Sequence, residues 1–164
     1  MAETITIRAT GPGDIAAVDA LLARSYPRLL AADYPPSAMV TAVPRIARAR
    51  PGLVTCGTYY LAEDARGRAL GAGGWTRNPR RPERAEIRHM VTDPAHLRRG
   101  IGRALLEHIV AQAGRHGLGV FDCLATRTAV PFYRAMGFVE LGAAEVALGP
   151  GIAFPVVRMI RGGT

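Results

Sequence analysis

The sequence predicts an α/β fold in which a mixed, mostly antiparallel sheet of about seven strands carries helices on both faces. Two observations lead to this prediction. One is a pair of strand-like segments joined by a short turn, and the other is a helix-length crossover that joins two later strands. The chain of 164 residues fits a single domain, 1–164, which can bury about 70% of its unfolded surface.

The first half of the chain predicts one strand, two helices and a hairpin, in that order. Thr4–Arg8 alternates polar threonines with apolar isoleucines, as a half-buried strand does. Helices are predicted near Gly13–Arg24 and Ser37–Arg48. The strands Thr58–Glu63 and Ala69–Thr76 follow, and the short turn between them indicates a hairpin.

The second half is organised around one long predicted helix. Ile101–His116 places an apolar residue at every fourth position and lies between the strands Ala85–Thr92 and Leu118–Ala125. Because a helix-length connection returns the chain in the same direction, these two strands are expected to run parallel. The remaining predicted elements are the helix Ala129–Met136 and two closing strands near Phe138–Ala147 and Phe154–Ile160.

Composition excludes several classes of protein. The formal charge is +8, and all 21 basic side chains are Arg. The arginines are scattered, and the densest run, Arg77–Arg84, has no interleaved aromatic residue to stack on bases, which disfavours nucleic acid as a partner. No apolar run has the 18 residues that a membrane span needs. Met1–Thr10 lacks an export pattern, so a cytoplasmic location with Cys56 and Cys123 as reduced thiols is expected.

A Gly-rich basic loop joins the strand that ends at Thr92 to the long helix. Gly100 and Gly102 can adopt conformations that turn main-chain amides toward one point, and the helix that follows adds the positive end of its dipole. Arginines flank the loop. A third Gly is absent, since Leu105 occupies its place, which disfavours a dinucleotide site. The Lys and Ser or Thr of a nucleotide triphosphate loop are also absent. The loop therefore predicts a diphosphate site of another kind.

Two sequence blocks resemble the GNAT superfamily of N-acetyltransferases. Leu97–Gly102 matches the family's pyrophosphate loop, with Leu97 at a position where the family has Gln or Arg. Thr126–Phe138 resembles the family's later helix, with its aromatic pair and its closing Gly and Phe, and Thr126 stands where Asn often begins the block. The resemblance covers about Ala69–Phe138 and implies that 1–164 is one N-acetyltransferase domain whose central parallel strands splay apart.

The resemblance also implies the donor and its binding residues. Acetyl-CoA enters the cleft between the splayed strands as a co-substrate, and its pantetheine arm pairs with the backbone of the first strand. The segment Tyr26–Pro36, with the segments around it, is implied to form part of the acceptor wall. The residues implied to bind the coenzyme are Met90, Val91, Thr92, Arg98, Arg99, Gly100, Ile101, Gly102, Arg103 and Thr126.

The implied reaction is direct attack of a primary amine, from a small molecule or a peptide, on the thioester within a ternary complex. Tyr133 is the candidate acid for the departing thiolate. Glu86 and His89 are the candidate bases, and strict alternation puts them on opposite faces of their strand. A phenol packed in the core, an ion-paired Glu and a hydrogen-bonded His are the structural alternatives for these three side chains.

Other possibilities stay open at this level. A non-catalytic acyl-CoA sensor or interaction module on the same fold is the alternative function. A homodimer is compatible with the family, but no interface can be identified. His96, His108 and His116 lack metal-ligand spacing, so no metal is predicted. The acceptor cannot be chosen from the fold, because the shared part of the family binds the coenzyme and the variable part binds the rest.

Overall fold

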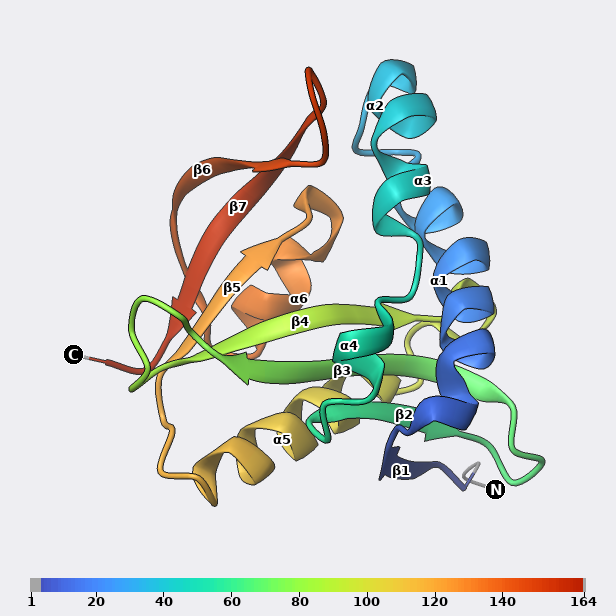
Figure 1. Ribbon diagram of the computed structural model, residues 1–164, viewed down its shortest axis with the longest axis vertical. Coiled ribbons are helices and arrows are strands. Elements are labelled where there is room, and N and C mark those ends of the chain that lie inside the picture. Colours follow the sequence, from blue (N-terminus) through green and yellow to red (C-terminus); the bar gives the residue numbers. More distant parts are fainter. Residues whose placement is uncertain (1–3, 164) are drawn as a thin grey trace.

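Residues 4–163 are described by the structure, a computed structural model, and they form a seven-stranded sheet with the order β1-β2-β3-β4-β5-β7-β6 (Figure 1). Residues 1–3, at the start of the segment expected to lack an export pattern, lie outside this range, as does Thr164. The strands are β1 (Thr6–Ala9), β2 (Tyr59–Glu63), β3 (Ala69–Arg77), β4 (Ala85–Thr92), β5 (Phe121–Ala125), β6 (Val139–Ala147) and β7 (Ala153–Arg161).

The sheet is antiparallel except where β4 meets β5. The connection between these two strands is the helix α5 (Ile101–Gly114), which returns the chain across one face of the sheet. The predicted parallel pair is therefore confirmed, and so is the mixed fold class. The hairpin between β2 and β3 closes where Asp64 accepts hydrogen bonds from the amides of Arg66 and Arg68.

Two apolar cores lie on the two faces of the sheet. On one face, α5 and the short helix α6 (Val130–Ala135) cover a core that contains Leu105, Phe121 and Tyr133. On the other face, the helices α1 (Ile15–Leu30), α2 (Pro36–Thr41), α3 (Val43–Ile46) and α4 (Pro51–Val54) cover a second core. Figure 1 shows these four helices in front of and beside β4. The prediction of helices on both faces is confirmed.

The helices on the α1 face differ from their predicted boundaries. A 3-10 turn, η1 (Pro12–Asp14), precedes α1, and α1 continues past Arg24 and Pro27 to Leu30. Burial of Tyr26 and Leu30 in the second core favours the extra turns in spite of the proline. The single helix predicted over 37–48 is two short helices, α2 and α3, because Pro44 begins a new turn within the first residues of α3.

Candidate active site

The parallel strands β4 and β5 separate soon after they meet. Only Ala85 and Glu86 of β4 have partners in β5, namely Phe121 and Asp122. Beyond Glu86, β4 continues beside β3 while β5 turns toward β7, and Figure 1 shows the two strands diverging. The backbone of β4 from Ile87 onward therefore faces β5 without a strand partner, and an extended ligand can take the place that a strand would occupy.

The loop after β4 brings uncapped amides to the open end of this split. Asp93 starts a short turn, η2 (Pro94–His96), by accepting a hydrogen bond from the amide of Ala95 at 2.9 Å, and it forms an ion pair with Arg24 of α1 at 2.9 Å. Burial raises the pKa of the Asp93 carboxyl, but these bonds outweigh it, and the net shift is downward. The loop is thus fixed to the α1 face by a charged carboxylate.

The start of α5 has the geometry of an anion site. Arg98 and Gly100 both have left-handed backbones, with φ of 63° and 77°. Gly100 is the N-cap of the helix, and no side chain caps it, so the first amides of α5 have no acceptor within the helix. These amides belong to Ile101, Gly102 and Arg103. Together with the helix dipole they favour a phosphate.

A cavity of about 240 Å³ opens directly over these amides. A Cβ at Gly102 would lie 3.1 Å from the ring of Phe132 and 3.5 Å from the hydroxyl of Thr92, so the absence of a side chain there keeps the cavity open. Six residues predicted to bind the coenzyme line the cavity, namely Thr92, Arg98, Gly100, Ile101, Gly102 and Arg103. Leu97, Phe132, Ala135 and Met136, which were not predicted to bind it, complete the lining.

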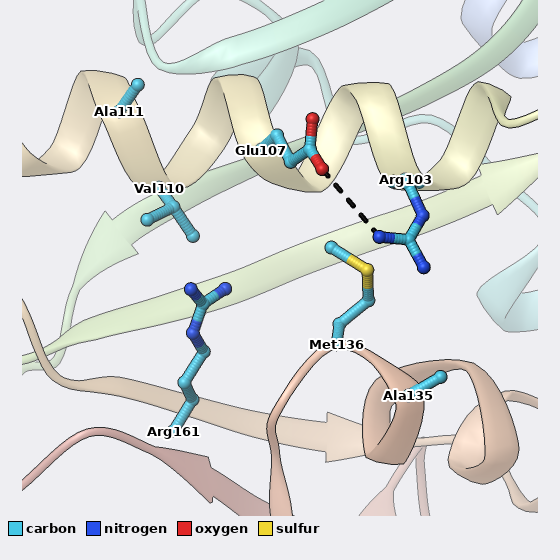
Figure 2. Close-up of a pocket in the computed structure, with 7 residues that line it drawn as sticks. All are labelled: Arg103, Glu107, Val110, Ala111, Ala135, Met136 and Arg161. Atoms are coloured by element: carbon cyan, nitrogen blue, oxygen red, sulfur yellow. Dashed lines mark ion pairs between the residues drawn. The ribbon is translucent and has the colours of Figure 1, made fainter.

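A second groove of about 350 Å³ continues from this cavity between α5, α6 and the end of β7. It shares Arg103, Ala135 and Met136 with the cavity. Figure 2 shows Arg103 paired with Glu107 on one wall, and the guanidinium of Arg161 pointing into the groove from the other side. The Arg103–Glu107 pair spans 3.9 Å and is well exposed, so it contributes little to stability. The groove therefore presents the guanidinium of Arg161 next to the cavity over the α5 amides.

Four predicted coenzyme residues lie outside the cavity lining. The side chain of Val91 is buried under α1, and the partly buried side chain of Met90 packs over β3. Arg99 is exposed on the loop. The hydroxyl of Thr126 accepts a hydrogen bond from the amide of Ala129 and caps the turn η3 (Arg127–Ala129) before α6. Their contacts with a coenzyme stay predictions.

A β-bulge in β4 corrects the prediction about its two faces. Ala72 pairs with Val91 and Gly74 with Arg88, so His89 and Met90 together stand opposite one residue of β3. His89 has a left-handed backbone with φ of 44°. The extra residue reverses the alternation beyond it, so that Ile87 lies in the core under α5 and Val91 in the core under α1. The predicted grouping of Ile87 with Val91 is wrong.

The two candidate bases consequently lie on the same face, not on opposite faces. Glu86 alternates with the buried Ala85 and Ile87 and so lies on the face of the sheet that α1 covers. The ring of His89 meets the ring of Tyr26 of α1 edge-on, with 6.4 Å between the ring centres. Burial, and then the charges of Arg50 and Arg88, lower the pKa of His89 to about 4. His89 is therefore neutral at pH 7.

The candidate acid Tyr133 lies on the opposite side of the split. Its ring packs between Phe132 and Phe138 at 5.2 Å from each, and it is only 4% exposed. Burial raises its pKa well above 10, and a hydrogen bond with the thiol of Cys123 adds to the rise. Burial likewise raises the pKa of Cys123 to about 12. At neutral pH both groups carry their protons, and Cys123 is a poor nucleophile.

Several residues of the site could not be identified from the sequence. Tyr59 of β2 and Tyr26 of α1 both reach the bulge, but a tyrosine in a strand or helix carries no sign of that contact. The Gly73–Gly74 pair was a usable signal, because glycines inside a strand often mark a bulge or the close approach of another group. A Cβ at Gly73 would overlap the sulfur of Met90.

Neither a membrane nor a metal site is evident within residues 4–163. None of the helices there combines the length and the apolar character that crossing a bilayer requires. In the same residues, His, Cys, Asp and Glu side chains nowhere gather in threes around a point where a metal ion could be held.

Comparison with known proteins identifies the family. The model of the acetyltransferase (GNAT) domain matches residues 55–140, more than half of the chain, and this segment includes β4, α5, β5 and α6. A comparison with curated protein sequences finds no match.

Solved structures share the fold at low sequence identity. A GCN5-related N-acetyltransferase from Rhodopseudomonas palustris is 20% identical, with a TM-score of 0.82 over 98% of this chain and 97% of that one. The PaiA N-acetyltransferase from Thermoplasma acidophilum, in complex with coenzyme A, is 15% identical, with a TM-score of 0.72 over 96% and 98%. A GNAT acetyltransferase from Staphylococcus aureus is 13% identical, with a TM-score of 0.68 over 96% and 98%. The chain belongs to the GNAT family of acetyltransferases and is an acyltransferase.

Proposed function

We propose that the protein transfers the acetyl group of acetyl-CoA to a primary amine of a small molecule or peptide, by direct attack within a ternary complex. The observation that carries the proposal is the split between β4 and β5, with uncapped helix amides at its open end. The split offers an extended backbone to a pantetheine arm, and the amides offer donors to a diphosphate. The coenzyme A complex of the Thermoplasma relative supports this choice of donor.

The groove beyond the cavity suits the nucleotide end of the coenzyme. Along α5, the lining runs from Arg103 to Ala111, about 12 Å at 1.5 Å per residue. We assign the adenosine 3′-phosphate to this groove, with Arg161 as its cation. Arg161 has no ion pair with a carboxylate in the described part of the chain, so its charge is available to a phosphate.

The acid and the base stand at the same level of the split, on opposite faces of the sheet. Glu86 pairs with Asp122 in the register of β4 and β5, and the next residue of β5, Cys123, contacts the phenol of Tyr133. Coenzyme approaching from the α5 face and amine approaching from the α1 face would thus meet between them. This arrangement supports a transfer without a covalent enzyme intermediate.

Each group has one proton to move. An alkylammonium with a pKa near 10.4 must lose a proton before it attacks, which at pH 7 costs about 4–5 kcal/mol without assistance. We assign this step to Glu86, directly or through a water molecule, because Glu86 pairs with Asp122, the neighbour of the residue that contacts Tyr133, whereas the ring of His89 packs against Tyr26. As the new C–N bond forms and the C–S bond breaks, the departing thiolate takes the proton of Tyr133, whose raised pKa keeps the phenol protonated until then. The acylated nitrogen gives up its second proton, which returns to the Tyr133 phenolate directly or through water and restores the acid.

The proposal is tested by following thiol release from acetyl-CoA across a panel of amines that includes aminoglycosides, polyamines, amino acids and peptides. We expect release with at least one class of primary amine, and an acetylated amine of the matching mass. Calorimetry should show coenzyme A binding to the protein without an acceptor.

Two negative results separate the alternatives. Binding of acetyl-CoA with no release for any amine would favour a sensor that has lost transfer. Failure of both coenzyme A and acetyl-CoA to bind at millimolar concentration would contradict the assignment of the donor site itself. A control with Gly102→Val, which fills the phosphate cavity, distinguishes binding at this site from binding elsewhere.

A further inference from the structure

Two buried tyrosine hydroxyls hold consecutive carbonyls of the bulge in β4. The hydroxyl of Tyr59 in β2 donates to the carbonyl of His89 at 2.9 Å. The hydroxyl of Tyr26 in α1 donates to the carbonyl of Met90 at a longer 3.4 Å. Tyr59 is 1% exposed and Tyr26 is 8% exposed, so water does not compete for either bond. The bulge is therefore tied both to the sheet and to the helix above it.

The bulge needs such support, because its conformation is strained. A left-handed backbone at a residue other than glycine costs about 1–3 kcal/mol and persists only where the surroundings impose it. His89 has φ of 44°. On the other side, Gly73 leaves space for the sulfur of Met90, which a side chain at position 73 would displace. Tyr59, Tyr26 and Gly73 thus act together on the two residues of the bulge.

A phenylalanine in place of either tyrosine would keep the apolar packing of the ring and lose only the hydroxyl. A buried polar group is costly unless it is hydrogen-bonded, and the ring alone supplies the apolar contact. Burial raises the pKa of Tyr59 well above 10 and also raises that of Tyr26, so both phenols remain donors throughout the working pH range. What the hydroxyls add is the position of the His89 and Met90 carbonyls.

We propose that Tyr59 and Tyr26 are positioning residues for acyl transfer, which hold the β4 bulge and thereby align the strand backbone that carries the thioester end of the coenzyme. The inference rests on the proposed function, which assigns the backbone of Met90–Thr92 to the pantetheine arm. The bulge follows the last residues paired with β5 and includes Met90, the first residue of that segment. A shift of about 1 Å in the bound thioester can lower the rate by about 100-fold.

The inference predicts a specific kinetic pattern. The variant Tyr59→Phe keeps the ring and loses the bond to His89, so kcat should fall by about tenfold or more. Affinity for coenzyme A should change by less than about twofold, since the uncapped amides of α5 lie outside the bulge and dominate its binding. Tyr26→Phe, which loses the longer bond, should show a smaller fall in kcat with the same unchanged affinity.

Tyr60→Phe is the matched control. Tyr60 is the next residue of β2, is 5% exposed, and points to the opposite face, where its hydroxyl accepts a hydrogen bond from Nε1 of Trp75 at 3.3 Å. Each variant removes one hydroxyl from a buried hydrogen bond, but only the Tyr59 and Tyr26 variants affect β4. We expect Tyr60→Phe to lower the melting temperature as Tyr59→Phe does while leaving kcat unchanged.

Amide hydrogen exchange gives a readout independent of turnover. Exchange over Ile87–Thr92 should be faster in Tyr59→Phe than in Tyr60→Phe, with α5 unchanged in both. Equal kcat in Tyr59→Phe, Tyr26→Phe and the wild type would overturn the inference, as would an equal loss of kcat in Tyr60→Phe. Wild-type protein that releases no thiol with any amine would overturn the proposed function and the inference with it, whereas active wild type with equally active tyrosine variants overturns the inference alone.

Discussion

The two faces of the sheet are covered by helices of different regularity. On the α5 face, one helix of 14 residues runs without interruption from the phosphate loop, and its apolar side packs on the strands. On the α1 face, three of the four helices have only four to six residues, each with a proline in its first turn, and α1 itself contains Pro27. The proposed donor side is thus built on one regular helix, and the proposed acceptor side on short segments held by tertiary contacts.

This difference has a functional counterpart. The proposed donor site depends on backbone geometry at a few positions, above all the start of α5. The proposed acceptor side depends on side chains such as Tyr26 and His89 that meet from separate elements. Changes on the donor face should therefore alter coenzyme binding, and changes on the acceptor face should alter turnover or stability with binding unchanged.

The largest expected effect is on the donor face, at Gly102. Gly102→Val places methyl groups against Phe132 and Thr92 and into the cavity over the helix amides. We expect coenzyme A affinity to fall by about 100-fold or more, because the phosphate loses its main-chain donors. Calorimetric titration with coenzyme A measures this directly.

Gly114→Val is the control for a new side chain in the same helix. A Cβ at Gly114 meets nothing within 4 Å, and Gly114 ends α5 far from the cavity. Its affinity for coenzyme A should match that of the wild type. Similar affinities in the Gly102 and Gly114 variants would mean that the donor site lies elsewhere.

The next effect concerns chemistry with binding unchanged, at Tyr133. Tyr133→Phe should lower kcat by about 100-fold, since the proton donor for the thiolate is lost, while the affinity for coenzyme A stays within about twofold. Because burial raises the pKa of Tyr133 well above 10, wild-type kcat should show no loss from its ionisation up to about pH 9. Steady-state rates of thiol release across pH give both quantities.

Cys123→Ala sharpens the assignment, because Cys123 is the hydrogen-bond partner of the phenol. With its pKa raised to about 12, the thiol is not a nucleophile at neutral pH, and its removal should change kcat by less than about threefold. A loss as large as that of Tyr133→Phe would instead indicate a covalent acyl-enzyme.

The sequence predicts the elements of the α5 face more accurately than those of the α1 face. Strand β4 has its predicted bounds, Ala85–Thr92, and α5 starts at Ile101 as predicted. Both depend on local signals, namely the periodicity of the apolar residues and the glycines of the loop. On the α1 face, α1 runs six residues beyond Arg24, since burial of Leu30 outweighs the local effect of Pro27. Local signals describe the donor side better than the acceptor side.

The bulge shows why the site itself was predicted less completely than the fold. Strict alternation along β4 predicts the faces of its residues correctly up to Arg88 and wrongly from His89 onward. The hydroxyl of Tyr59, 30 residues away, donates to the carbonyl of His89, and Gly73 leaves space for Met90 beside it, so no local rule reveals the bulge. Contacts between distant segments are the information that a single sequence lacks.

A pH experiment tests whether His89 is buried in its neutral form on the α1 face. The folded pKa of His89, about 4, lies below its usual 6.5, so between these values the unfolded chain binds the proton more tightly. The free energy of unfolding keeps its full contribution from the neutral His89 above pH 6.5 and loses it progressively as the pH falls toward 4. Between pH 7 and pH 5 this loss is about 2 kcal/mol, and His89→Asn, which tolerates a left-handed backbone, should remove it. Urea unfolding at pH 7 and pH 5 measures the difference.

His108→Gln is the comparison for this experiment. Burial also lowers the pKa of His108, but His108 lies on α5, on the donor face, against the ring of Tyr60. Its substitution should remove a smaller part of the acid loss. Parallel loss of stability in the wild type and His89→Asn would contradict the buried, neutral state of His89.

The smallest expected effect is at the outer end of the donor face, in the groove of Figure 2. Arg161→Gln removes the cation assigned to the 3′-phosphate. Because the groove is open to water, the pair should contribute about 1 kcal/mol, so that KM for acetyl-CoA rises about fivefold with kcat unchanged. KM for the 3′-dephospho form of acetyl-CoA should be the same in the variant and the wild type.

Arg158→Gln separates a specific contact from the general effect of lost positive charge. Arg158 is exposed on the same strand as Arg161, where it stands opposite Leu124 of β5 in the register. Because it lies three residues before Arg161, its side chain points to the opposite face of the sheet and does not line the groove. A general electrostatic effect would raise KM in both variants and for both donors. A rise confined to Arg161→Gln and to the 3′-phosphorylated donor would place the nucleotide in the groove, and so extend the donor face from the start of α5 to the end of β7.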